Sequence, residues 1–132
     1  MSCLFDSIAH AVAKRPGLVR CARYQCVRDI APITGATIRA AACELMRLVR
    51  IHELALCEWG AMETGGTADA YVDAMRGAST WGGGVELAAL AAGFRVPIRV
   101  DGPMGSFAFG EKYVNNAAPI SVAYTGAHYT AR

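Results

Sequence analysis

Apolar residues recur every three or four positions along the first two thirds of the chain, which is the period of amphipathic helices. The first stripe predicts a helix that begins near Cys3 and ends before Pro16-Gly17. A second helix is expected over 18–31, where Pro32 ends it. A long third helix is expected over 37–57, with Thr37 as its N-cap.

The helical pattern continues after a Gly-containing loop that is expected over 59–66. Thr67 is a suitable N-cap for a short helix that Gly77 ends. Ser79 or Thr80 is expected to cap the last helix, and Gly93 is expected to be the left-handed residue just past its end. The chain up to this point therefore reads as helical.

The period then changes to alternation, which predicts strands. The expected strands are Arg95–Val100, Ser106–Phe109, Lys112–Val114, Pro119–Tyr124 and Ala127–Arg132. Helices that precede strands indicate an α+β fold, with N-terminal helices packed on a small, mostly antiparallel C-terminal sheet. The length of 132 residues fits one domain over 1–132.

Composition excludes several classes of protein. Apolar residues make up 54% of the chain, enough for a core, and the net charge of +2 is too small to argue for nucleic acid. No apolar run approaches the roughly 20 residues of a membrane span, and no signal peptide is visible. We therefore expect neither a nucleic-acid partner nor a membrane partner.

The five cysteines, an odd number, show no metal-binding spacing. They are Cys3, Cys21, Cys26, Cys43 and Cys57. Free thiols in a reducing compartment explain them most simply, and we expect no metal and no cofactor. A small metal-binding domain would need spacings that the chain lacks.

Cys3 has the position that thiol chemistry favours. At a helix N-terminus, free N–H groups and the helix dipole stabilise an anion and lower the pKa of a thiol. A thiol nucleophile also needs a base, and His128 stands at the start of the last strand. His10 lies two turns along the same helix as Cys3 and reads as a surface or structural residue, and His52 reads as a half-buried structural residue.

Three motifs occur in a fixed order. Cys3-Leu4-Phe5 opens the first helix, Trp81-Gly82-Gly83 precedes Glu86-Leu87 with Gly84 in the spacing, and His128-Tyr129 stands near the end. Tyr71 and Met75 precede the second motif, and Ile98-Arg99-Val100 follows it. This ordered set, spread over nearly the whole chain, resembles the ovarian-tumour (OTU) family of cysteine proteases.

The resemblance implies a papain-like OTU fold and hydrolysis of isopeptide or peptide bonds at the C-terminus of ubiquitin or a ubiquitin-like modifier. It implies Cys3 as the nucleophile, His128 as the general base and ubiquitin conjugates as partners. The chain is as small as the compact viral members of the family. This similarity implies cleavage of a viral polyprotein as a second reaction. It also implies a location in the cytoplasm, or in a host cytoplasm if the protein is viral. The alternative is a silent OTU-like domain that binds ubiquitin or another partner.

Two positions depart from the family pattern. Thr130 stands where many members carry an acidic or amide residue that orients the histidine, so we expect a Cys–His dyad with Thr130 as a weak orienting residue. Met1-Ser2 replaces the usual Asp-Gly before the cysteine. The resemblance places the oxyanion hole at the backbone N–H groups of Ser2 and Cys3. The short N-terminus either leaves this hole incompletely supported or indicates that the native chain extends upstream.

Overall fold

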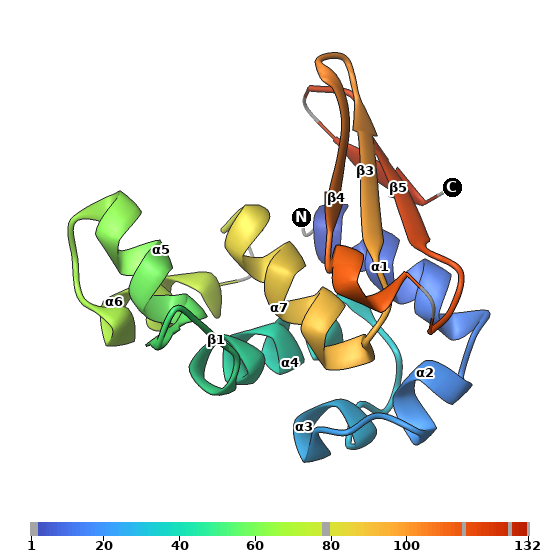
Figure 1. The fold of residues 1–132 in the computed structure, drawn as a ribbon, viewed down its shortest axis with the longest axis horizontal. Coiled ribbons are helices and arrows are strands. Elements are labelled where there is room, and N and C mark those ends of the chain that lie inside the picture. Colours follow the sequence, from blue (N-terminus) through green and yellow to red (C-terminus); the bar gives the residue numbers. More distant parts are fainter. Residues whose placement is uncertain (1–2, 78–79, 115, 127, 132) are drawn as a thin grey trace.

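A computed structural model describes residues 3–77, 80–114, 116–126 and 128–131. The helices of this part of the chain are α1 (Cys3–Ala13), α2 (Gly17–Arg20), α3 (Gln25–Arg28), α4 (Gly35–Leu48), α5 (Leu56–Thr64), α6 (Ala68–Met75), α7 (Gly84–Phe94) and the 3₁₀ helix η1 (Glu111–Tyr113). The strands are β1 (Arg50–Ile51), β2 (Leu54–Ala55), β3 (Ile98–Gly102), β4 (Gly105–Phe109), β5 (Ile120–Tyr124) and β6 (Tyr129–Ala131). The expected α+β order is confirmed (Figure 1).

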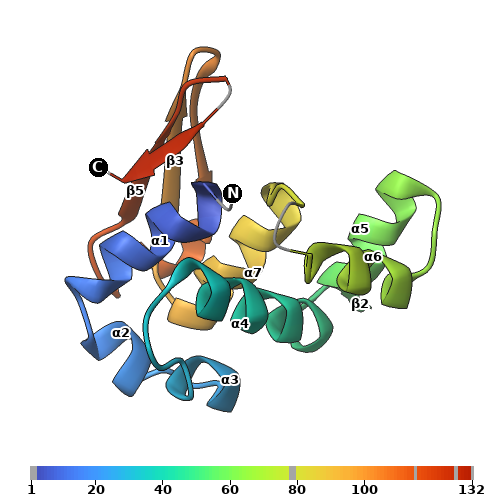
Figure 2. The same ribbon diagram turned by 180° about the vertical axis from the view of Figure 1, so that it is seen from behind.

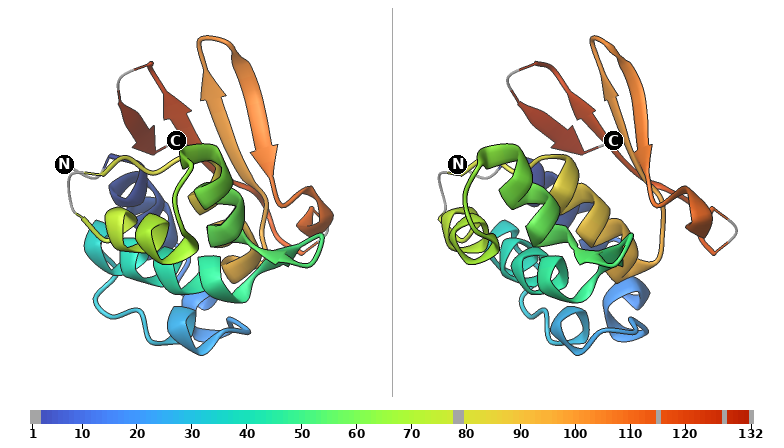
Figure 3. Two further views of the ribbon diagram at one scale, coloured as in Figure 1. Left: turned by 90° about the vertical axis from the view of Figure 1, so that its left-hand side faces the viewer. Right: turned by 60° about the vertical axis from the view of Figure 1, so that its left-hand side comes forward.

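The C-terminal sheet has the strand order β4-β3-β5-β6. The outer pairs β3–β4 and β5–β6 are antiparallel hairpins, whereas the central pair β3–β5 is parallel. Figure 3 shows the two hairpins projecting beyond the helices. The prediction of a mostly antiparallel sheet is therefore confirmed.

Helix α4 lies at the centre of the helical layer and packs against both α1 and α7. Helix α1 in turn contacts β5 and β6, whereas α7 contacts β3 and β4, so these two helices share one face of the sheet. Ile8, Leu45, Leu90 and Ile120, one from each of four elements, are fully or almost fully buried in the joint core. None of the described helices combines the length and the apolar character that crossing a bilayer requires.

The expected second helix over 18–31 is wrong, because the chain breaks it into the two short helices α2 and α3. Arg28 stabilises the break by donating from Nη1 to the carbonyl oxygens of Ala22 and Arg23, both at 2.7 Å. These carbonyls would otherwise lack a helical partner. A side chain that reaches back five and six residues leaves no periodic signal in the sequence.

The third helix begins and ends earlier than expected. Its N-cap is Thr34, whose hydroxyl accepts from the N–H of Thr37 at 3.2 Å, while Thr37 Oγ1 accepts from the N–H of Thr34 at 2.9 Å. This reciprocal capping box places Thr37 inside the first turn. The helix then ends at Leu48 rather than near Cys57.

A tight hairpin and a further helix follow α4, where a helix end and a loop were expected. Strands β1 and β2 pair around His52 and Glu53, whose φ angles of 52° and 69° are those of a type I′ turn. Neither residue is the usual Gly or Asn, so the turn carries no sequence signal. Helix α5 then occupies most of the predicted loop, and Glu58 caps it by accepting from the N–H of Ala55 at 2.7 Å.

The ends of α7 also differ from expectation. The N-cap is Gly83, not Thr80, and the residue in the left-handed conformation past the end is Arg95, with φ 56°. Gly93 lies inside the helix, where an added Cβ would stand 2.5 Å from Leu45 Cδ1, so this glycine permits close packing. The strand expected over 112–114 is wrong, since Glu111–Tyr113 forms η1.

Candidate active site

Helix α1 begins at Cys3, as the sequence predicts. Leu4 and Phe5, the next two residues, are buried and fix the first turn against the core. The N–H groups of this turn have no partner within the helix and leave a partial positive charge at its start. The side chain of Cys3 and the whole of Ser2 lie outside the described residues.

His128 is exposed and stands in the turn between β5 and β6. Thr125 holds its backbone on both sides: Thr125 Oγ1 accepts from the N–H of His128 at 3.1 Å, and the N–H of Thr125 donates to the His128 carbonyl at 2.9 Å. Tyr124 adds a third bond from its hydroxyl to the Gly126 carbonyl at 3.0 Å. The backbone of His128 is therefore held by Thr125, while its side chain is exposed.

The packing of α1 on β5 and β6 brings these two segments together. Tyr129, the residue after His128, is half-buried against the core, and its ring lies 4.7 Å from that of Tyr124 between centroids. Figures 1 and 2 show the β5–β6 turn at the same end of α1 as Cys3, not at its C-terminal end. A cysteine and a histidine from opposite ends of the sequence thus belong to one region.

The loop Trp81–Gly83 lies directly on the first turn of α1. A Cβ added to Gly82 would stand 2.7 Å from Leu4 Cδ2 and 3.0 Å from the ring of Phe5, so only glycine permits this approach. Trp81 remains 54% exposed beside it. The Gly82 contact therefore places this loop along the start of α1.

Glu86 is a buried carboxylate, 1% exposed, that holds this loop. Its Oε1 accepts from the N–H of Gly83 at 2.7 Å, and its Oε2 accepts from the hydroxyl of Tyr71 at 2.6 Å. Burial, and then the hydrogen bond to Glu86, raises the pKa of Tyr71 far above its usual range. Tyr71 and Glu86 both belong to the ordered motifs of the sequence, but nothing in the sequence indicates that they form a hydrogen bond with each other.

Arg39 of α4 is a second buried charged residue near the start of α1, and is 4% exposed. Its guanidinium lies 4.4 Å from the centroid of the Phe5 ring, and Nη1 donates to the Met75 carbonyl at 2.8 Å. Burial lowers the pKa of Arg39, and the nearby side chains of Cys43, Glu86 and Asp6 oppose that shift. Arg39 thereby connects the first turn of α1 to the end of α6.

Thr130 lies on β6, paired with Ala123 of β5, and is exposed. Side chains alternate along a strand, so Thr130 and Tyr129 lie on opposite faces of β6, and His128 precedes the strand in the turn. Whether the hydroxyl acts on the imidazole stays a prediction.

The other histidines and cysteines do not join this region. His10 is exposed on α1, and His52, which we expected to be half-buried, is exposed in the β1–β2 turn, edge-on to Trp59. Burial raises the pKa values of the Cys26 and Cys43 thiols, which keeps them protonated and weakly nucleophilic. Within the described ranges, no group of three His, Cys, Asp or Glu residues is placed to hold a metal ion.

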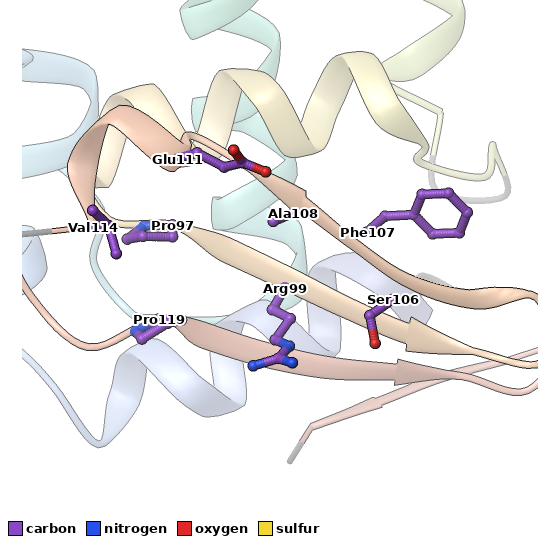
Figure 4. Close-up of a pocket in the computed structure, with 8 residues that line it drawn as sticks. All are labelled: Pro97, Arg99, Ser106, Phe107, Ala108, Glu111, Val114 and Pro119. Atoms are coloured by element: carbon purple, nitrogen blue, oxygen red, sulfur yellow. The ribbon is translucent and has the colours of Figure 1, made fainter.

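A separate pocket of about 450 Å³ lies on the face of the sheet that is turned away from α1 and α7 (Figure 4). Its charged side chains are Arg99, which pairs with Asp101 at 3.5 Å, and Glu111. The remaining lining is small or apolar and supplies no thiol and no imidazole: Pro97, Ser106, Phe107, Ala108, Val114 and Pro119. This pocket is therefore not part of the thiol site.

A helix that begins at a cysteine and packs on a strand that follows a histidine is an arrangement suited to thiol hydrolases. A family model described as OTU-like cysteine protease matches residues 2–131, so this chain belongs to that family. A solved OTU domain in complex with ubiquitin has the same fold, with a TM-score of 0.65 at 19% identity. The match covers 98% of this chain but 62% of that chain, so the present chain spans less than two thirds of its length. The comparison with curated proteins found no match.

Proposed function

We propose that this domain is a cysteine-type deubiquitinase that hydrolyses isopeptide or peptide bonds at the C-terminus of ubiquitin or a ubiquitin-like modifier. The observation that carries the proposal is the packing of α1, which begins at Cys3, on the hairpin that carries His128. Membership of a cysteine protease family supports a catalytic role for Cys3 and His128. The ubiquitin bound to the structural neighbour supports the choice of substrate.

In the proposed reaction His128 takes the proton of the Cys3 thiol, and the thiolate attacks the carbonyl carbon of the scissile bond. The oxyanion that forms is stabilised by the backbone N–H groups of Cys3 and Ser2. The imidazolium then gives its proton to the leaving amine, which departs as the thioester forms. Water, activated by His128, hydrolyses the thioester and restores the thiol.

The catalytic unit is proposed to be a dyad, with Thr130 as an orienting residue. A threonine hydroxyl accepts a hydrogen bond from the imidazole but carries no charge, so it fixes the ring without the electrostatic support of a carboxylate. A cysteine nucleophile tolerates this because the thiolate–imidazolium pair forms in the resting enzyme, assisted by the helix terminus. A cytoplasmic location, where the thiol stays reduced, is part of the proposal, as is a viral polyprotein as a second substrate.

The decisive experiment is reaction with a ubiquitin probe that carries a C-terminal electrophile, followed by peptide mapping of the adduct. We expect one adduct at Cys3 that is lost in Cys3→Ala. Cys21→Ala is the matched control, because Cys21 is an exposed free thiol outside the candidate site. An adduct at Cys21 would show that the probe labels an exposed thiol outside the candidate site and would contradict the proposal. Saturable ubiquitin binding without any adduct would indicate a silent ubiquitin-binding domain instead of an enzyme.

A further inference from the structure

A pocket of about 350 Å³ lies at the C-terminal end of α7, where the α2–α3 connection, the end of α7 and η1 meet. Its volume falls within the range of small-molecule sites, about 300–1,000 Å³. Its lining contains three cations, two tyrosines, an amide and one small residue: Arg23, Arg95, Lys112, Tyr24, Tyr113, Asn116 and Ala92. None of the described residues that line it is acidic.

The positive charge of this pocket is not neutralised within the described part of the chain. The ion pairs found there are Arg47–Asp69, Arg76–Glu44 and Arg99–Asp101, and none includes a cation of the pocket. Glu111, the sequence neighbour of Lys112, lines the separate pocket on the outer face of the sheet. The C-terminus of α7 contributes a negative pole of only about half a charge, which leaves a clear positive surplus.

The backbone holds Arg95 in a conformation that an arginine does not favour. Its φ of 56° and ψ of 40° lie in the left-handed region, where glycine is the common residue after a helix. The Asn116 amide fixes this geometry by donating from Nδ2 to the Arg95 carbonyl at 3.2 Å. A charged side chain kept at a strained position is a mark of functional sites, because a glycine would satisfy the backbone better.

We propose that this pocket binds a small organic phosphate. A concave site with a surplus of cations focuses the field on an anion, and guanidinium groups match the oxygens of a phosphate with two parallel hydrogen bonds. Lys112 adds a point charge above the Tyr113 ring, at 5.3 Å from its centroid. The two tyrosines provide walls for the organic part of the ligand.

The pocket is lined by Ala92 and Arg95 at the C-terminal end of α7, whereas the loop Trp81–Gly83 precedes the N-terminal end of this helix, so the pocket is separate from the thiol site. The helix that connects them is 11 residues long, or about 16 Å. Ligand binding is therefore measurable on the resting protein, without any reaction at Cys3. This inference stands or falls independently of the proposed hydrolase activity.

The test uses the full chain with pyrophosphate as the first probe and AMP against adenosine as a matched pair. We expect pyrophosphate and AMP to raise the melting temperature saturably, and adenosine to have no effect. Arg23→Gln and Lys112→Gln should each weaken pyrophosphate binding by about tenfold or more in calorimetric titration. Arg95→Gly is the sharpest variant, because it should raise the melting temperature of the free protein while abolishing the shift caused by pyrophosphate.

Arg50→Gln is the control, since it removes the same charge from an exposed residue of β1 outside the pocket. Binding by Arg50→Gln should equal that of the unmodified chain. The proposal is overturned if Arg50→Gln weakens binding as much as Arg23→Gln, which would indicate a general effect of net charge. Absence of saturable binding, or an undiminished pyrophosphate shift in Arg95→Gly, overturns it equally.

Discussion

Replacing Tyr71 by phenylalanine should destabilise the domain by removing one hydrogen bond without changing its shape. The Tyr71 hydroxyl donates to Glu86 Oε2 at 2.6 Å, and Glu86 is 1% exposed, so water cannot take the vacant place easily. A hydrogen bond to a charged group contributes about 1.5–3 kcal/mol, and a buried group left unpaired keeps the full cost of its desolvation. We therefore expect Tyr71→Phe to lower the free energy of unfolding by about 1.5–3 kcal/mol.

The assay is urea unfolding with thermal melting in parallel. For a domain of this size, about 1 kcal/mol corresponds to about 3–4 °C, so the melting temperature should fall by about 5–12 °C. The urea slope should stay unchanged, because the surface exposed on unfolding is the same. Tyr24→Phe is the control: Tyr24 is also half-buried, but its hydroxyl makes no hydrogen bond among the described residues, and the change should stay within about 0.5 kcal/mol.

Unfolding at alkaline pH gives a second measurement of the interaction between Tyr71 and Glu86. Burial, and then the bond to Glu86, raises the pKa of Tyr71 in the folded protein, so the folded state holds this proton more tightly than the unfolded state. The resulting stabilisation is fully present below the unfolded tyrosine pKa of about 10 and is lost as the pH rises above it. The stability of Tyr71→Phe should therefore decline less above about pH 10. Two results would refute the energetic role of this bond. One is that the free energy of unfolding of the two proteins declines in parallel above about pH 10. The other is that Tyr71→Phe lowers this free energy by less than about 0.5 kcal/mol at neutral pH.

Three further substitutions test the candidate site. His128→Ala should leave a folded protein with kcat/KM reduced by about 10²–10⁴-fold on a ubiquitin substrate, and unchanged turnover would remove His128 from the mechanism. Thr130→Ala should cost no more than about 0.5–1.5 kcal/mol, or about tenfold in kcat/KM, whereas a fall to the level of His128→Ala would make Thr130 essential. Thr125→Val removes the hydroxyl that accepts from the His128 N–H and should lower kcat/KM by about tenfold with little change in stability; full activity would show that the backbone bond alone holds the turn.

Periodicity predicted the α+β class, the start of α1, the strand that contains β5 and the order of helices before strands, because these depend on local apolar spacing. Periodicity missed the break between α2 and α3, because Arg28 stabilises this break by donating hydrogen bonds to backbone carbonyls of the connecting loop. It missed the β1–β2 hairpin because His52 and Glu53 adopt positive φ without being glycine or asparagine. Both errors arise where tertiary or turn geometry overrides the local pattern.

The sequence predicted only some residues of the candidate site. Cys3 and His128 were named from the sequence because ordered motifs mark them, and the packing of α1 on the β5–β6 hairpin is consistent with that choice. Thr125 was not named, because its role depends on a hairpin register that places its hydroxyl against the His128 backbone. The Tyr71–Glu86 bond joins residues 15 positions apart on two helices, and no spacing rule connects them.

The packing of α1 on β6 also has a consequence for protein synthesis. Within this domain α1 is translated before the hairpin that completes its surroundings, so a nascent chain carries the thiol long before the histidine. At about 5–20 residues per second this delay is about 6–25 s. During this interval a growing chain has Cys3 without His128, and a chain that terminates within it never acquires the proposed catalytic pair.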